Sequence, residues 1–283
     1  MAKGAASDAD HVFFDLEDAC APSEKERGRA LAVAALRQHD FGSKTRVVRV
    51  NGVTTPWCHG DIVEIVTGAH ETLDALIIPK IEEAAEVHFV DYLLREVERA
   101  VGARRTVRLE ILIESARGAA NVRQIARASD RIDVLIFGPA DYAASLGVPQ
   151  TEIGMIDERY PGHQWHWVMS EIAVHARAIG AQAIDGPHAD YVDAASYTSS
   201  ALRAKLLGFD GKWCIHPNQI PWANDVFSPS PEELDAARRL LETYEEALRA
   251  GQGAISVDGR LVDEASRRLA EATLARGEAV ASR

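Results

Sequence analysis

The sequence predicts an α/β fold in which a parallel sheet of barrel type is surrounded by helices. Short apolar runs alternate with longer segments of helical periodicity along most of the chain, and this alternation is typical of parallel βαβ units. Seven such strands are predicted, one fewer than a closed (β/α)8 barrel contains. The chain has 283 residues, a length that suits either one barrel of about 250 residues with an appendage or two domains.

The predicted strands mostly end in polar or charged residues. These strands are 11–18, 45–52, 75–80, 108–115, 134–141, 181–188 and 212–217. The predicted helices are 23–39, 57–69, 82–102, 116–132, 166–180 and 193–208. Ser23 is expected to cap the first helix, with Glu26 three positions on. Residues 142–165 show little periodicity and predict a long loop.

The pattern changes after Pro217. We therefore expect a barrel domain over residues 1–225 and a C-terminal appendage over 226–283 that serves as a lid and in oligomerisation. In the appendage, Ser230 precedes a helix that opens on a proline, and an AspGly pair at 258–259 predicts a hairpin before a terminal helix.

Composition and charge limit the class of function. Hydrophobic residues make up 47% of the chain, enough for a large core, and the formal net charge is −12, which argues against nucleic acid and anionic membranes. The three cysteines have no C-x-x-C spacing and predict a reducing, cytoplasmic location. The N-terminus lacks the apolar core of a signal peptide.

Two carboxylates follow neighbouring predicted strands within residues 106–141. Glu114 lies at the end of the first of these strands and Asp141 at the end of the second. Neighbouring strands lie about 4.8 Å apart, so both side chains can reach one hard cation, and Mg²⁺ keeps water and substrate oxygens as its other ligands. Gly138 and Pro139 would let the backbone approach a substrate closely, and only Gly138 offers an N–H.

Further charged residues are expected at the same rim. Arg49 closes the strand at 45–52, and its planar fork suits a carboxylate or an enolate oxygen. An ion pair of Arg49 with Glu17 or Asp18 is the structural alternative. Glu17 and Asp18 would orient Arg49 and Lys80 or bind metal waters, or form a purely structural network. Lys80 also permits Schiff-base chemistry, but the paired carboxylates favour a metal mechanism.

Eight segments in a fixed order carry a family resemblance. They are DLEDACAPSEK (15–25), RVNG (49–52), IIPKIE (77–82), LIESARG (112–118), FGPADYA (137–143), AIDGP (183–187), GFDGKWCIHPNQI (208–220) and GAISVDGRLVDEA (253–265). Together they resemble the HpcH/HpaI aldolase/citrate lyase β-subunit family of CoA-ester lyases. YPGHQWHW (160–167) and GKWCIHP (211–217) most resemble its malyl-CoA/β-methylmalyl-CoA lyase branch.

The resemblance implies a (β/α)8 barrel that reversibly cleaves malyl-CoA or β-methylmalyl-CoA to glyoxylate and acetyl-CoA or propionyl-CoA. It implies Mg²⁺, with Mn²⁺ as an alternative ion, on Glu114 and Asp141, and substrate on Arg49. It also implies a catalytic Asp263 donated by a neighbouring subunit, and hence a homo-oligomer such as a trimer or hexamer. Asp258 is the rival position in the same hairpin.

The resemblance leaves alternatives open. Citramalyl-CoA cleavage, malyl-CoA hydrolysis and malate synthesis all suit the same site. The strand that family members carry before DLED is absent, which fits the count of seven and keeps a non-catalytic, metabolite-binding subunit as an alternative. His163 and His166 have the spacing of a ligand pair on a helix, but no third ligand follows at zinc spacing, so a surface role is favoured.

Overall fold

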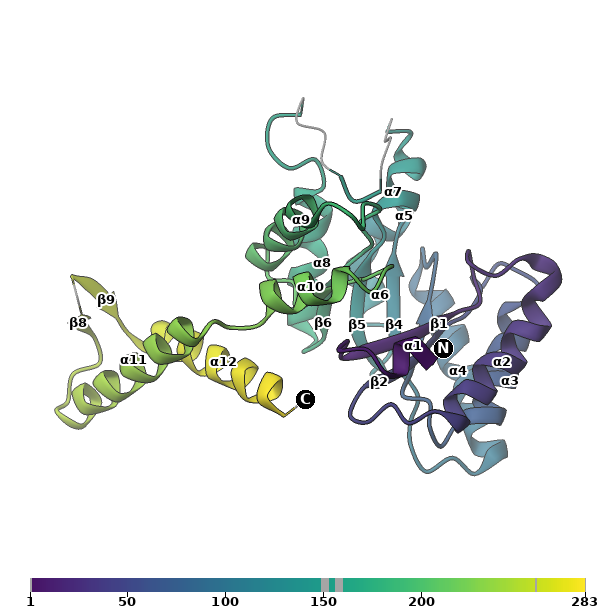
Figure 1. Ribbon diagram of the computed structural model, residues 1–283, viewed down its shortest axis with the longest axis horizontal. Helices are drawn as coiled ribbons and strands as arrows, with labels where there is room; N and C mark the ends of the chain where they lie inside the picture. The colour runs from purple at the N-terminus through teal and green to yellow at the C-terminus, as the bar shows by residue number, and fades with distance from the viewer. Residues whose placement is uncertain (1, 149–152, 156–159, 258, 283) are drawn as a thin grey trace. The chain divides into compact units, whose positions relative to one another are not determined.

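The computed structural model describes residues 2–148, 153–155, 160–257 and 259–282 (Figure 1). The chain forms two compact units, Met1–Ala223 and Asn224–Arg283.

The first unit is built on one curled sheet of seven parallel strands (Figure 1). The strands are β1 (His11–Asp15), β2 (Thr45–Arg49), β3 (Ala75–Ile78), β4 (Arg108–Ile113), β5 (Ile132–Phe137), β6 (Gln182–Asp185) and β7 (Gly211–Lys212). Each strand is hydrogen-bonded to the next one along the chain. In the described part of the chain, β1 and β7 are the two edges of the sheet, so the barrel wall stays open between them. The predicted barrel-type fold with seven strands is confirmed.

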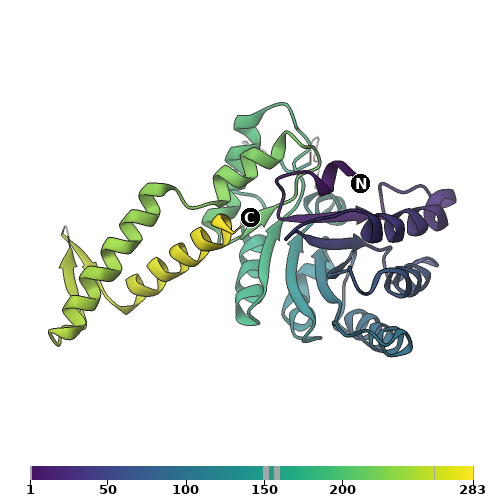
Figure 2. The ribbon, with the colours of Figure 1, turned by 60° about the horizontal axis from the view of Figure 1, so that its bottom comes forward.

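The first unit also contains helices that alternate with these strands. They are α1 (Ala2–Ala5), the 3₁₀ helix η1 (Pro22–Glu24), α2 (Lys25–Gln38), α3 (Cys58–Ala69), α4 (Ala84–Val101), α5 (Ala116–Ala120), α6 (Val122–Ala126), α7 (Pro139–Leu146), α8 (His166–Ala178), α9 (Ala194–Leu206) and α10 (Gln219–Phe227). Figure 2 shows α2, α3 and α4 side by side along the first strands, and each contacts the next. α10 spans the boundary between the two units.

Alternation along the strands divides the core into two layers. One set of side chains fills the concave interior: Val47, Ala75, Ile77, Leu112, Val134, Ile136 and Trp213, with Phe13 and Ile184 packed against them. Their strand neighbours, such as Val48, Leu76 and Leu135, are buried on the other face, as successive side chains point to opposite faces. Burial on both faces explains why these strands appear as continuous apolar runs.

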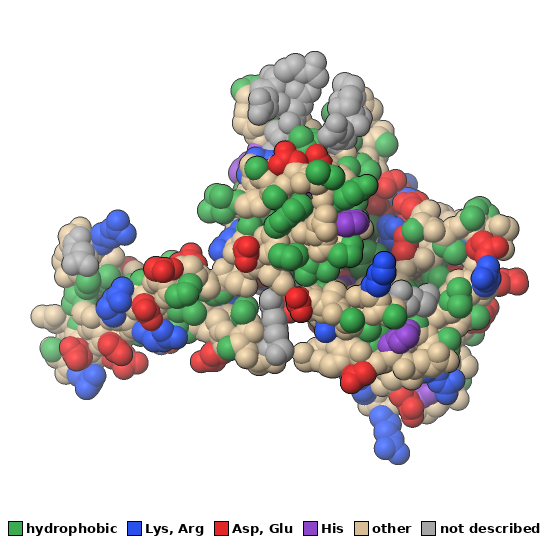
Figure 3. All heavy atoms as spheres, viewed as in Figure 1, with side chains coloured by type: hydrophobic (Ala, Val, Ile, Leu, Met, Phe, Trp, Pro, Cys, Tyr) green, Lys and Arg blue, Asp and Glu red, His purple; other side chains and the backbone are tan. Residues whose placement is uncertain are grey.

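The second unit is a helical hairpin with a small two-stranded sheet. It contains α11 (Pro231–Arg249), β8 (Ile255–Val257), β9 (Arg260–Val262) and α12 (Glu264–Ala281), and β8 pairs antiparallel with β9. Ser230 caps α11 through a reciprocal bond with Glu233, as its position predicts. Acidic and basic side chains are interspersed on the visible face of this unit (Figure 3). Asp258 lies outside the described residues.

Four predicted features differ from the structure. Ser23 does not cap a helix, because it lies inside η1, and α2 begins two residues later without a side-chain cap. The predicted helix 116–132 is two short helices that meet at Asn121. The last strand is only the two residues of β7, and the predicted loop from residue 142 begins inside α7.

Within the described residues, no helix has the length and apolar character needed to cross a bilayer.

Candidate active site

The carboxyl ends of five neighbouring strands bring the predicted site residues together. Asp15 and Arg49 are the last residues of β1 and β2, and Lys80 lies two residues past β3. Glu114 and Gly138 directly follow β4 and β5. Parallel strands end at the same edge of a sheet, so these residues lie on one rim. In parallel barrels this edge carries the chemistry.

Glu114 is buried and closely surrounded. The residue is 4% exposed, and its Oε1 accepts a hydrogen bond from the backbone N–H of Lys80 at 2.8 Å. Lys80 itself has a φ of 56°, in the left-handed region that non-glycine residues rarely adopt. A Cβ on Gly138 would lie 2.5 Å from Glu114 Cβ and 2.8 Å from its Oε2. Gly138 therefore allows β5 to end directly against this carboxylate.

The electrostatics of Glu114 fit a divalent cation. Burial, followed by the charge of Asp141, raises the pKa of Glu114 to about 8. Within the described ranges, no group of three or more His, Cys, Asp or Glu side chains has the arrangement of a metal site. Two carboxylates alone leave most of the coordination sphere to water and substrate, which is how Mg²⁺ commonly binds. Carboxylate oxygens also suit Mn²⁺.

Asp141 and Gly138 belong to the start of α7. Asp141 lies in the first turn of this helix, where the helix dipole favours a negative charge. The N–H of Gly138 donates to Ile113 O at 3.0 Å, so that amide is engaged in the sheet. The contribution of Gly138 to the site is its lack of a side chain beside Glu114.

Arg49 is held from several sides. Its Nε and Nη2 donate to the two oxygens of Asp15 at 2.7 and 2.6 Å. Its Nη1 lies 3.1 Å from Glu17 Oε2, and the guanidinium lies 5.6 Å from the ring centroid of Trp213. Burial would raise the pKa of Asp15, but Arg49 outweighs it and holds that pKa below its usual value. The sequence predicts Glu17 or Asp18 as the partner; the main partner is Asp15, which lies opposite Arg49 in the register of β1 and β2.

Lys80 is paired with the acids that follow β1. Its ammonium binds Glu17 and lies 3.5 Å from Asp18 Oδ1. Burial lowers the pKa of Lys80, but the hydrogen bond and charge of Glu17 outweigh it, so this pKa is raised. A Schiff-base lysine needs the opposite shift. The structure therefore favours the role of Lys80 as an ion-pair partner.

Lys25 is a structural residue of the site that the sequence analysis missed. It is buried, and its ammonium donates to Leu16 O, Glu17 O and Asn51 Oδ1 at 2.6, 2.8 and 2.7 Å. These bonds use all three donors of the ammonium and join the end of β1 to the end of β2. The only sequence signal is its position in the motif DLEDACAPSEK, which marks the residue but not its partners.

Asp263 belongs to the second unit. It caps α12, and its Oδ1 accepts from the N–H groups of Ala265 and Ser266 at 3.0 and 3.2 Å. Its proposed role in catalysis remains a prediction. His163 accepts a bond from Trp165 N at 3.1 Å through Nδ1, which favours a structural role over metal binding with His166.

Comparisons with known proteins identify the family of this chain. A model of the family described as HpcH/HpaI aldolase/citrate lyase matches residues 1–217. The L-malyl-CoA/beta-methylmalyl-CoA lyase of Cereibacter sphaeroides is 40% identical, over 99% of this chain and 91% of that protein. A (3S)-malyl-CoA thioesterase of the same species is 35% identical, over 99% of this chain and 90% of that protein.

A solved structure of similar sequence has a similar fold. It is the protein CitE from Mycobacterium tuberculosis in complex with magnesium, acetoacetate and coenzyme A. It is 32% identical with a TM-score of 0.77, over 98% of this chain and 93% of that one. The resemblance seen in the motifs is confirmed: the chain belongs to the HpcH/HpaI aldolase/citrate lyase family.

Proposed function

We propose that the protein is a Mg²⁺-dependent carbon–carbon lyase for CoA esters. It reversibly cleaves malyl-CoA or β-methylmalyl-CoA to glyoxylate and acetyl-CoA or propionyl-CoA. The observation that carries the proposal is the pair Glu114 and Asp141 at the rim, beside Arg49. The lyase of C. sphaeroides, similar over nearly the whole chain, and the magnesium and coenzyme A bound to CitE support it.

Glu114 and Asp141 would hold the ion, whose Lewis acidity would polarise the oxygens of the oxo-acid fragment. During cleavage of malyl-CoA, the hydroxyl loses its proton and becomes the glyoxylate carbonyl. The electrons of the broken C–C bond pass to the thioester fragment as an enolate. Protonation of that carbon then gives acetyl-CoA, so the proton balance closes without water.

Arg49 and Asp263 have separate roles in this sequence. A guanidinium has five N–H groups. Two of them contact Asp15 and one contacts Glu17, and Asp18 Oδ2 lies 4.0 Å from Nη1. The remaining N–H groups would stabilise the enolate oxygen. Asp263 would carry the proton to and from the reacting carbon or oxygen as a general acid–base group, on a second unit that acts as a lid.

A coupled assay tests the proposal. Purified protein with Mg²⁺ and malyl-CoA is expected to release glyoxylate, and Glu114→Gln and Asp141→Asn are expected to abolish release while the far-ultraviolet circular dichroism stays native. Glu96→Gln, which removes an exposed acid paired with Arg99 on α4, is the matched control and should retain activity. Release of glyoxylate that persists in both ligand variants would contradict the metal site.

Product analysis separates the alternatives. Free thiol and malate without glyoxylate would indicate hydrolysis, the activity named for the thioesterase relative. Pyruvate from citramalyl-CoA would indicate a larger oxo-acid pocket, and malate from acetyl-CoA and glyoxylate a synthase. Absence of turnover together with no calorimetric binding of acetyl-CoA would indicate the non-catalytic subunit.

We also propose a homo-oligomer, a trimer or hexamer, in which Asp263 acts in the site of a neighbouring subunit. Asp263→Asn and Glu114→Gln should each be inactive alone. If Asp263 acts in trans, subunit exchange between the two variants should restore part of the activity, because some sites then combine a native Glu114 with a native Asp263. A monomer by light scattering, or no recovery after demonstrated exchange, would contradict this arrangement.

A further inference from the structure

A buried ion pair lies on the outer face of the sheet, which faces away from the barrel interior. Asp185 and Lys212 face each other across β6 and β7 in the sheet register. Their side chains are 7% and 1% exposed, and Lys212 Nζ lies 2.5 Å from Asp185 Oδ2. The adjacent strand residues Ile184 and Trp213 belong to the interior cluster, so the pair projects to the other face of the sheet, toward the helices.

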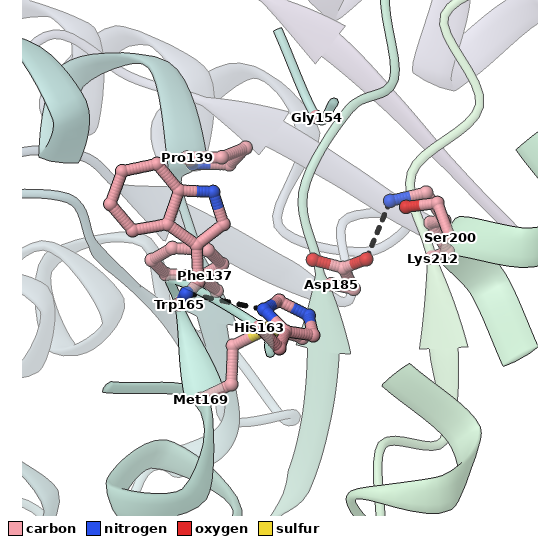
Figure 4. Close-up of a pocket in the computed structure, with 9 residues that line it drawn as sticks. All are labelled: Phe137, Pro139, Gly154, His163, Trp165, Met169, Asp185, Ser200 and Lys212. Carbon is pink, nitrogen blue, oxygen red and sulfur yellow. Dashed lines mark hydrogen bonds and ion pairs between the residues drawn. The ribbon is translucent and has the colours of Figure 1, made fainter. Parts of the chain in front are cut away.

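The pair lines a small cavity between the sheet and the helices. Figure 4 shows Asp185 and Lys212 opposite each other, with Trp165, His163 and Met169 on the side of α8. Ser200 of α9 also lines the cavity. None of the residues predicted for the metal site points a carboxylate into this space, so the proposed chemistry gives the ion pair no direct role.

Both members of the pair hold the peptide groups of Gly186. Lys212 Nζ donates to Gly186 O at 2.9 Å, and Gly186 N donates to Asp185 Oδ1 at 2.9 Å. The backbone of Asp185 is fixed in turn, because Trp213 N donates to its carbonyl at 2.9 Å. Both the N–H and the carbonyl of Gly186, the residue directly after β6, are therefore fixed by hydrogen bonds to the ion pair.

Gly186 in turn lies against the start of α7. A Cβ on Gly186 would lie 2.5 Å from Pro139 Cδ and would also clash with Phe137 O. Pro139 is the first residue of α7, and Asp141 lies in the same turn. A continuous line of contacts thus leads from the ion pair through Gly186 and Pro139 to the helical turn that carries Asp141.

We propose that Asp185 and Lys212 are positioning residues for the metal site: their ion pair fixes Gly186, and Gly186 fixes the first turn of α7 and the direction of Asp141. The inference rests on the proposed assignment of Glu114 and Asp141 as metal ligands. A buried ion pair often adds little net stability, since desolvation offsets the attraction. Its geometric effect on α7 is therefore separable from a general effect on folding.

Mn²⁺ affinity, measured from free Mn²⁺ by electron paramagnetic resonance, tests the proposal without turnover. Asp185→Leu/Lys212→Met replaces the pair with apolar side chains, and Gly186→Ala pushes on Pro139 without changing any charge. Each is expected to raise the Mn²⁺ dissociation constant about 10- to 100-fold, the usual effect of losing the residues that orient metal ligands. Thermal unfolding shows which variants are folded. If Asp185→Leu/Lys212→Met is not folded, the Mn²⁺ dissociation constant of Gly186→Ala alone decides the test.

Arg177→Met is the matched control. It removes the more exposed ion pair of Arg177 with Asp210, 2.6 Å apart, which also joins α8 to the chain before β7. This variant should lower the unfolding temperature without changing the dissociation constant. Values within twofold of wild type in both Asp185→Leu/Lys212→Met and Gly186→Ala would overturn the inference and leave the metal site standing. A wild-type protein without Mn²⁺ binding, or Glu114→Gln and Asp141→Asn with native affinity, would overturn the metal site itself.

Discussion

At the scale of single residues, the charged side chains of the candidate site differ in whether they form ion pairs. Arg49 is engaged with Asp15 and Glu17, and Lys80 with Glu17 and Asp18. Glu114 instead lies beside another acid and has a strongly raised pKa. Deep burial beside Asp141 distinguishes Glu114 from the acids that are paired with Arg49 and Lys80, and it sets the expected effects of substitution.

We expect Arg49→Lys to lower kcat about 10²- to 10³-fold, the usual effect of removing a donor that stabilises a developing oxyanion. A lysine cannot reproduce the fork that binds Asp15 and substrate together. Asp15→Asn should lower kcat with a smaller change in KM, because Arg49 remains but is less firmly oriented. Initial rates across malyl-CoA concentrations measure both values. Arg46→Lys, near the start of β2 and away from the rim, is the control. A kcat for Arg49→Lys within tenfold of wild type would refute the assignment.

Borohydride reduction during turnover should leave Lys80 unmodified. Glu17 keeps its ammonium protonated, and only a neutral amine attacks a carbonyl. Mass spectrometry of the reduced protein gives the answer, with free glyoxylate and an exposed lysine peptide as a positive control for the reduction. A glyoxylate adduct that is specific to Lys80 would favour the Schiff-base alternative.

At the scale of elements, strand–helix alternation was predictable and helix boundaries were less so. The periodicity of α8 or α9 reflects an amphipathic segment of more than ten residues. The start of α2 depends on whether one serine adopts a capping conformation or joins a 3₁₀ turn, and tertiary packing decides that. Ser23 and Ser230 have similar sequence contexts but different roles.

This difference predicts different effects on stability. Ser230→Ala should destabilise the protein by about 1 kcal/mol, because it removes a capping bond to Glu233 N at 3.1 Å. Ser23→Ala should change the free energy of unfolding by less than about 0.5 kcal/mol, as for surface substitutions without special contacts. Urea unfolding followed by circular dichroism compares the two. Equal losses would contradict the helix starts described here.

At the scale of the whole molecule, one polar pair spans the interior of the open barrel. His11 Nε2 of β1 lies 2.8 Å from Glu110 Oε1 of β4, although these strands are separated by two others. Burial lowers the pKa of His11, but the charge and hydrogen bond of Glu110 outweigh it and raise this pKa above 6.5. The pair therefore ties the stability of the curled sheet to pH.

The sign of this dependence follows from linkage. A raised pKa in the folded state means that the His11 contribution is full below pH 6.5 and is lost as pH rises through the folded pKa. The stability difference between wild type and His11→Gln should therefore be largest below pH 6.5 and shrink above it. Urea unfolding at several pH values measures this difference. His59→Gln, at an exposed position, is the control, and a difference that is constant with pH would contradict the pairing.

The sequence by itself determined the family, the order of the strands and the placement of Glu114 and Asp141 at neighbouring strand ends. These depend on local periodicity and on motifs of a few residues, which a single sequence displays directly. Tertiary structure alone decided the clamp of Asp15 on Arg49, the three bonds of Lys25 and the pair of Asp185 with Lys212. Their partners lie 34, 26 and 27 residues apart in the chain, and only the sheet register and the burial of both members select them from the many other charged residues.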